Sequence, residues 1–185
     1  MIIKTERLIL RPWELRDAQE LSIIANNPNV SKNLIETFPY PYTLKAAKSW
    51  TKSNVGLRRE THFVITLDDR IVGGIGFGID PQDQTVATMG YWLGEDYWGK
   101  GIATEALINV TDYAFANFGL KKIEARVYMW NPQSAHVLEK AGYKLEDTLK
   151  NSSLKAGILV DEWLYSKTRS IESSSIEQQS LRRIN

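Results

Sequence analysis

A glycine-rich loop between a strand and a long helix constrains this chain more than any other feature. Residues 85–93 read as a strand, and residues 102–118 carry an apolar stripe at helical spacing. Between them, Gly99 and Gly101 allow the backbone to turn tightly and to approach a ligand with no side chain in the way. The free N–H groups at the start of a helix attract anions, and a diphosphate is their natural ligand.

Two common nucleotide-binding motifs do not fit this loop. The P-loop pattern GxxxxGK[ST] is absent, and GxGxxG fails because Thr104 stands where its third glycine would be. ATP and dinucleotides therefore lose their main support as ligands. A tight turn with close helix packing is the structural alternative to a phosphate-binding role.

Charge and composition argue against several other classes of function. The chain has 23 Lys and Arg against 22 Asp and Glu, a formal net charge of +1, so we expect no general attraction to nucleic acid or to anionic membranes. It has no cysteine and only two histidines, His62 and His136, which argues against a metal site. The N-terminus lacks a signal-peptide layout and no apolar stretch is long enough to span a bilayer, so we expect a cytoplasmic protein.

The chain of 185 residues is long enough for one domain with its own core. Periodicity predicts further strands over 5–12, 62–67, 71–79, 122–130, 143–149 and 158–166, and further helices over 14–26, 44–59 and 132–141. Antiparallel hairpins followed by a β-α-β crossover predict an α+β fold with a mixed sheet of about six to seven strands and about four helices. We assign residues 1–169 to this domain and expect the polar residues 170–185 to form a mobile tail.

A second motif follows about thirty residues after the loop. Asn131-Pro-Gln-Ser134 begins a helix that stops at Gly142, which by itself indicates only a capped helix. With both segments at this spacing, the chain resembles the GNAT superfamily of N-acetyltransferases, and within it the Rim-type ribosomal-protein-alanine acetyltransferase branch. The resemblance covers about residues 3–168 and includes the segments TERLILRP, YWLGEDYWGKGIATEAL, NPQSAHVLEKAGY and DEWLYS. It implies the GNAT fold and transfer of an acetyl group from acetyl-CoA to a primary amine, with no metal.

The resemblance also implies where CoA binds. The family's diphosphate loop has the form R/Q-x-x-G-x-G/A, and here a tryptophan stands in its first position, as is usual in the Rim-type branch. The diphosphate would be held, mainly through backbone N–H groups, by Trp98, Gly99, Lys100, Gly101, Ile102, Ala103 and Thr104. The pantetheine arm would pair with the strand edge at Tyr91, Trp92 and Leu93 and would contact Asn131.

The group that protonates the departing thiolate also follows from the resemblance. Many members of the superfamily carry a tyrosine for this task, but Leu138 occupies that position here. The Rim-type branch instead has a serine three residues after the asparagine, which is Ser134. We expect Ser134 to donate a hydrogen bond to the thiolate and to act as the acid.

The general base stays open at this point. Thr88 stands where relatives in this branch often have a glutamate, and Glu36, Asp80 and Asp83 are more often plain solvated loop carboxylates. At pH 7 an N-terminal α-amine is roughly 10–20% neutral, whereas a lysine amine is less than about 0.1% neutral. A site without a strong base therefore suits an α-amine better.

Three functions agree with the resemblance. The leading one is acetylation of a protein N-terminal amine, the second is acetylation of a polyamine, an amino acid or an amine antibiotic, and the third is a CoA-binding regulatory module without turnover. By analogy the acceptor site lies near the first two helices and residues 36–43. Aromatic candidates for its lining are Trp13, Phe38, Tyr40, Tyr42 and Trp50. The sequence favours neither a monomer nor a homodimer.

Overall fold

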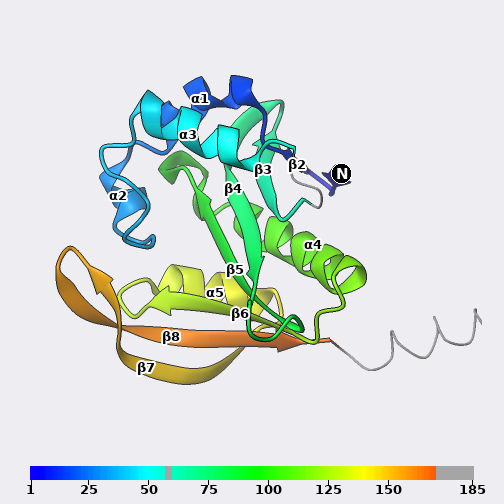
Figure 1. Ribbon diagram of the computed structural model, residues 1–185, viewed down its shortest axis with the longest axis vertical. Coiled ribbons are helices and arrows are strands. Elements are labelled where there is room, and N and C mark those ends of the chain that lie inside the picture. The colour runs from blue at the N-terminus through cyan, green and yellow to red at the C-terminus, as the bar shows by residue number, and fades with distance from the viewer. Residues whose placement is uncertain (57–59, 170–185) are drawn as a thin grey trace, which may run out of the picture.

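The computed structural model describes residues 1–56 and 60–169 and places one sheet of eight strands through the molecule, in the order β1-β2-β3-β4-β5-β6-β8-β7 (Figure 1). The strands are β1 (Ile3–Lys4), β2 (Leu8–Pro12), β3 (His62–Leu67), β4 (Arg70–Ile79), β5 (Val86–Leu93), β6 (Lys122–Tyr128), β7 (Lys144–Lys155) and β8 (Ile158–Thr168). The helices are α1 (Ala18–Ile24), α2 (Pro28–Ser31), α3 (Leu44–Asn54), α4 (Ile102–Asn117) and α5 (Pro132–Lys140). The predicted mixed sheet of the GNAT fold is confirmed, with one strand more than we expected.

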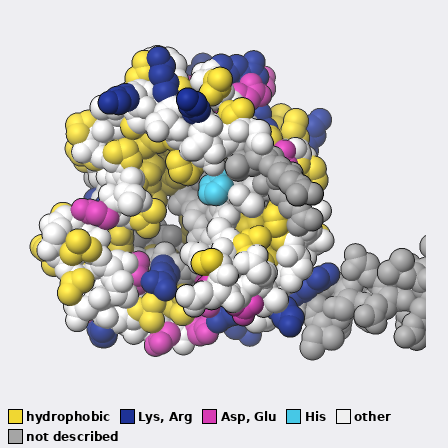
Figure 2. All heavy atoms as spheres, in the orientation of Figure 1, with side chains coloured by type: hydrophobic (Ala, Val, Ile, Leu, Met, Phe, Trp, Pro, Cys, Tyr) yellow, Lys and Arg dark blue, Asp and Glu magenta, His cyan; other side chains and the backbone are white. Residues whose placement is uncertain are grey.

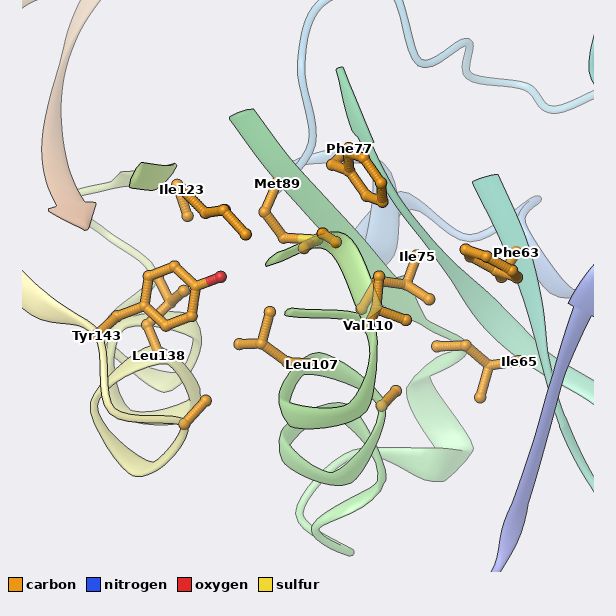
Figure 3. Close-up of a cluster of buried hydrophobic side chains, with 14 of the residues drawn as sticks. Phe63, Ile65, Ile75, Phe77, Met89, Leu107, Val110, Ile123, Leu138 and Tyr143 are labelled. Carbon is orange, nitrogen blue, oxygen red and sulfur yellow. The ribbon is translucent and has the colours of Figure 1, made fainter. Parts of the chain in front are cut away.

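Two helical layers cover opposite faces of the sheet. α4 and α5 pack on one face against a large apolar cluster that includes Ile123, Ala125 and Val127 of β6 (Figure 3). α1 and α3 pack on the other face in a second, smaller cluster. Because strand side chains alternate, the even-numbered residues of β5 and β6 point away from α4 and α5. The two faces of the sheet therefore offer different surroundings at the same point along a strand.

Several boundaries differ from the predictions. Of the predicted strand 5–12 only Leu8–Pro12 is a strand, because the backbone N–H of Thr5 turns back to donate to the carbonyl of Leu8, and the two-residue strand β1 lies before it. The predicted helix 14–26 ends at Ile24, and Pro28 opens the short helix α2, since proline suits the first turn and Asn27 caps it by accepting from the Asn29 N–H at 2.7 Å. β7 runs on to Lys155, beyond the predicted end. The predicted mobile tail, residues 170–185, lies outside the described residues.

The parallel pair β5 and β6 separates after a short contact. Only three residue pairs join them, Val86 with Lys122, Ala87 with Ile123 and Thr88 with Glu124. Beyond these pairs the two strands diverge, and β5 continues with β4 while β6 continues with β8 (Figure 1). We call this opening the splay. It leaves the facing edges of two strands without a sheet partner in the middle of the molecule.

Candidate active site

The glycine loop lies at the end of β5 that borders the splay. Gly99 and Gly101 have φ angles of 73° and 76°, in the left-handed region where other residues cost about 1–2 kcal/mol. Gly101 is the N-cap of α4, and Ile102 points its side chain into the core. A Cβ at Gly99 would meet no atom within 4 Å, so the loop surrounds open space. The first turn of α4 therefore presents its free N–H groups beside a surface that lacks side chains.

A clasp from the N-terminal strands fixes this loop. The Arg7 guanidinium pairs with Glu105 at 2.7 Å through Nε and donates to the Lys100 carbonyl at 3.0 Å. Burial raises the pKa of Glu105, but hydrogen bonds from Thr5 and Arg7 outweigh it and lower that pKa overall. The Trp98 indole Nε1 donates to the Leu93 carbonyl at 2.9 Å. Trp98 thus braces the turn through its side chain.

A shallow groove of about 440 Å³ borders the clasp. Its lining is Thr5, Glu6, Gly101, Thr104, Glu105, Ile108, Asn109 and Lys140. The groove extends from the glycine loop along α4, and Lys140 brings a positive charge from α5. Its volume lies within the range of small-molecule sites.

Ser134 and Tyr91 meet at the splay. The Tyr91 hydroxyl lies 2.9 Å from Ser134 Oγ and donates to the Ser134 carbonyl at 3.0 Å. Burial raises the pKa of Tyr91, so its phenol stays neutral and can donate a proton in a hydrogen bond. Asn131 caps α5 by accepting from the Ser134 N–H at 3.3 Å. The structure therefore brings together three of the residues that the sequence singled out.

The opposite face of the splay is aromatic. Trp92 lies there in edge contact with Phe38, with 5.7 Å between ring centroids. Val86 of β5 pairs with Lys122 of β6, and Trp92 and Tyr128 each lie six residues further along, so they hold matching positions on the two strands. The Tyr128 ring stacks on Trp130, with 4.5 Å between the ring centroids. Burial raises the pKa of Tyr128, and the negative charges of Glu162 and Glu36 raise it further. Two aromatic walls and two carboxylates thus share this face.

A bridge through α2 closes the open end of the splay. On one side the Glu95 carboxylate accepts from the side-chain amides of Asn27 at 2.8 Å and Asn29 at 3.0 Å. On the other side Lys155, at the tip of the β7–β8 hairpin, donates to the carbonyls of Ser31 at 3.0 Å and Leu34 at 2.7 Å. We call α2 with these contacts the α2 bridge. Figure 2 shows this face of the molecule hollowed between the part that carries α1 and α3 and the part that carries β6 to β8.

The three loop carboxylates weighed as bases fall in different places. Asp80 and Asp83 lie in the turn before β5, and at about 3.4 Å per residue this strand puts them roughly 20 Å from its Leu93 end. Each accepts backbone N–H groups of its own turn. Glu36 lies at the α2 bridge, where it accepts from the Ala156 N–H at 3.1 Å.

The five aromatic candidates for the acceptor site also separate. Phe38 is the one that contacts Trp92 across this face. Trp13 and Tyr42 pack inside the second apolar cluster, with α1 and α3, where they are 3% and 5% exposed. Their place in this cluster follows from tertiary packing that the sequence does not show. Two others lie at the surface, Tyr40 and Trp50.

Sequence reasoning missed one carboxylate beside the splay, Glu162 of β8, the strand next to β6. It is 4% exposed and sits directly opposite Tyr128 in the β6–β8 register. Ser152 and Ser153 of β7 each donate a hydroxyl to its Oε2 at 2.8 Å. The sequence shows only a glutamate at the start of the otherwise apolar strand segment 162–165. This pattern can be interpreted only once the strand pairing is known.

Two other kinds of site are absent from residues 1–56 and 60–169. No group of three or more His, Asp or Glu side chains is placed to hold a metal ion there. In the same residues no helix combines the length and the apolar character that a membrane crossing requires.

Comparisons with known proteins agree with this geometry. The acetyltransferase (GNAT) domain matches residues 7–144. An uncharacterized N-acetyltransferase, p20 of Bacillus licheniformis, is 32% identical over 168 residues, which is 88% of this chain and 93% of that protein. RimJ of Mycobacterium smegmatis, solved with a CoA-disulfide, superposes with a TM-score of 0.78 at 29% identity, over 90% of this chain and 83% of that one.

Two further relatives have names that state an acceptor. The ribosomal-protein-serine acetyltransferase of Escherichia coli is 32% identical over 57% of this chain and 59% of its own length. The spermidine N(1)-acetyltransferase of the same organism is 26% identical over 76% of this chain and 74% of its own length. The two names point to different acceptors but both state the transfer of an acetyl group. The chain belongs to the GNAT family and is an acyl-CoA-dependent N-acetyltransferase.

Proposed function

We propose that this enzyme transfers the acetyl group of acetyl-CoA to the N-terminal α-amine of a protein or peptide. The observation that carries the proposal is the arrangement at the splay. The glycine loop lies at one end of β5, and Ser134 and Tyr91 meet across the opening beside it. The diphosphate, the pantetheine and the thioester of acetyl-CoA thus each find a suitable protein group: the glycine loop, the edge of β5 and the pair of Ser134 and Tyr91, in that order.

The groups that would bind acetyl-CoA belong mainly to the backbone. The first-turn N–H groups of α4 suit a diphosphate, because the helix dipole favours negative charge there. The groove along α4, with Lys140 on its rim, suits the nucleotide part of CoA. The unpaired edge of β5 at residues 91–93 offers backbone groups to the pantetheine amides. The amide Nδ2 of Asn131 donates no hydrogen bond within the described residues, which leaves it for the same arm.

The chemistry asks little of an acid. The neutral amine attacks the thioester carbonyl, the C–N bond forms and the C–S bond breaks. A thiol with a pKa near that of cysteine, about 8.5, gives a thiolate that is a fair leaving group near neutral pH. Ser134 donates to that thiolate, and the neutral Tyr91 hydroxyl, 2.9 Å from Ser134 Oγ, helps to hold the serine side chain in place. Most of the rate comes from holding two reactants in line.

An α-amine is favoured over a lysine by the cost of removing its proton. The α-ammonium gives up its proton roughly 2.5 pH units below a lysine ammonium. Thr88 supplies no carboxylate at the position where relatives often have one. The relative that acts on a ribosomal protein supports the same class of acceptor.

The test is thiol release from acetyl-CoA across a panel of amines. The panel holds peptides that begin with Ala, Ser or Met, the same peptides with a blocked α-amine and a free lysine, spermidine, and amine antibiotics. Release with a free α-amine and its loss on blocking would support the proposal. Release with spermidine or antibiotics alone would establish a small-amine acetyltransferase instead, and CoA binding without any release would favour a regulatory module.

A further inference from the structure

We propose that Glu162 is the catalytic carboxylate that receives the acceptor's ammonium group and takes its proton. The inference rests on the proposed function and adds the base that the sequence left open. It starts from a side chain that is 4% exposed, although glutamate is almost never buried unless it is paired. Its nearest cation, Arg126, lies 3.9 Å away and is itself half exposed.

The two oxygens of Glu162 differ. Oε2 accepts the hydroxyls of Ser152 and Ser153, both at 2.8 Å, and these two contacts hold the carboxylate in one place. Oε1 accepts no hydrogen bond within the described residues. Among those residues every fully buried side-chain N or O atom has a partner, so Oε1 keeps access to solvent. One oxygen is therefore anchored and the other is left for a donor.

The position of Glu162 is on the acceptor face of the sheet. Tyr128, its partner in register, points away from α4 and α5, and directly opposed residues of an antiparallel pair share a face. Ser134 and Tyr91 approach the splay from the other face, where α5 packs. An amine that lies against Glu162 and a thiolate that lies against Ser134 are thus on opposite sides of the thioester carbon. The amine can therefore add to one face of the thioester carbonyl while the departing thiolate stays beside Ser134.

The charged and titratable groups around Glu162 come from three segments. They are Arg126 and Tyr128 on β6, Glu36 in the loop after α2, whose charge like that of Glu162 acts on Tyr128, and Lys155 at the end of β7, which lies beside Glu36. Lys155 directs its donors to the carbonyls of Ser31 and Leu34, and it lies 3.9 Å from Glu36. The aromatic faces of Tyr128 and Trp130 complete the surroundings, and such faces attract an ammonium.

Another carboxylate on the same face is a weaker candidate. Glu124 lies at the closed end of the splay, opposite Thr88. Its carboxylate is paired with the Lys122 ammonium at 2.8 Å, and Glu146 shares that lysine at 2.7 Å. A carboxylate already held by a lysine has less to offer a second ammonium. Glu124 is therefore a matched control for Glu162.

The proton balance of the reaction closes with this assignment. The acceptor ammonium gives one proton to Glu162 and becomes a neutral amine, which attacks the thioester carbonyl. As the C–S bond breaks, the thiolate takes a proton from Ser134. The new amide nitrogen loses its second proton, which restores Ser134 through water, and Glu162 releases its own proton to solvent. The products are the acetylated amine, CoA as a free thiol and one proton.

The test compares Glu162→Gln with Glu124→Gln and the wild type. The measured quantity is kcat/KM for an Ala-initiated peptide at saturating acetyl-CoA, between pH 6.5 and 9. We expect E162Q to lower kcat/KM at pH 7 by about 100-fold, the lower end for loss of a general base. Its rate should rise about tenfold per pH unit up to the acceptor's own pKa, about 7.7–8.0, because only neutral amine then reacts. The wild type should stay nearly flat over the same range, E124Q should match it, and CoA affinity should be unchanged in both variants.

Several outcomes would overturn the assignment. They are an E162Q variant within twofold of wild type, a wild-type profile that already rises tenfold per pH unit, or a loss in E124Q equal to that in E162Q. If E162Q does not fold, Glu162→Asp decides: a shortened carboxylate should lose about tenfold at pH 7 and keep the flat profile, and a tenfold-per-unit rise would contradict us.

A wild type that releases no thiol with any amine would instead overturn the proposed function. In that case tryptophan fluorescence titration with the Ala-initiated peptide, with CoA bound, tests Glu162 separately. Equal affinity in the wild type and E162Q, or no binding in either, would refute its role as the ammonium receptor. Weaker binding in E162Q alone would support that role.

Discussion

The two sides of the splay differ in the groups that they offer to a ligand, which are backbone groups on one side and side chains on the other. The side of the glycine loop is made of backbone, and its residues run nearly continuously from Tyr91 to Thr104. The opposite side is made of side chains, and besides Trp92 of β5 they come from three other segments, represented by Phe38, Tyr128 and Glu162. A side-chain site can change one residue at a time, and we expect the choice of acceptor to reside there.

The largest effect is expected when a side chain is added on the side of the splay that binds through its backbone. Gly101→Val places a branched residue at φ 76° and puts a Cβ 3.4 Å from the Arg7 guanidinium. We expect CoA affinity to fall by roughly 100-fold, a loss of about 2.7 kcal/mol from strain and displaced N–H groups. Calorimetric titration with CoA measures it.

Gly119→Val is the matched control for this variant. It carries the same kind of strain at φ 67°, but at the far end of α4 with open space around it. It should lower stability and leave CoA affinity unchanged. Equal affinity losses in the two variants would show that the strain acts through folding and not through the loop.

A smaller effect separates the two sides at their meeting point. Ser134→Ala should lower kcat by about tenfold, less than is usual for a lost acid, because a thiolate leaves readily. Tyr91→Phe should cost less, since Ser134 keeps its own hydroxyl. CoA affinity should hold in both variants. Burst kinetics of thiol release report the change, and an undiminished rate in S134A would remove the acid role.

A still smaller effect should appear only on the side-chain side. Lys155→Ala removes two hydrogen bonds of the α2 bridge, so the acceptor KM should rise about threefold while the Kd for CoA stays the same. Lys150→Ala is the control, because Lys150 pairs with Asp161 at 2.8 Å on the same hairpin and touches neither α2 nor Glu162. An equal rise in both variants would contradict the role of the bridge.

The smallest effect concerns stability and neither side of the site. Burial lowers the pKa of His62 below its usual 6.5, so folding keeps this imidazole neutral while the unfolded chain takes up a proton. Stability should therefore fall as the pH drops below about 6.5, and level off below the folded pKa. Denaturant melts between pH 5 and 7 should lose this slope in His62→Gln. They should keep it in His136→Gln, whose histidine is exposed.

The same contrast explains what the sequence could predict. The glycine loop, the cap at Asn131 and the apolar stripe of α4 are local patterns, and each appears where it was expected. Glu162 could not be assigned, because its burial follows from two strand pairings and from two serines ten and nine residues earlier in the chain. α2 was missed because a proline can end one helix and begin another. A local motif can be recognised from the sequence, whereas the convergence of distant side chains cannot.

The α2 bridge has a topological consequence. It joins the end of β5, through Glu95, to the tip of the β7–β8 hairpin, through Lys155, so the splay is a closed frame and not an open slot. A ligand can enter a closed frame from either face of the sheet but not from its edge. On the proposed function, we expect the acyl end of the donor and the amino end of the acceptor each to arrive end-on, from opposite faces. A chain terminus would meet that condition without any movement of the frame, whereas the middle of a folded segment would meet it only if the bridge opened.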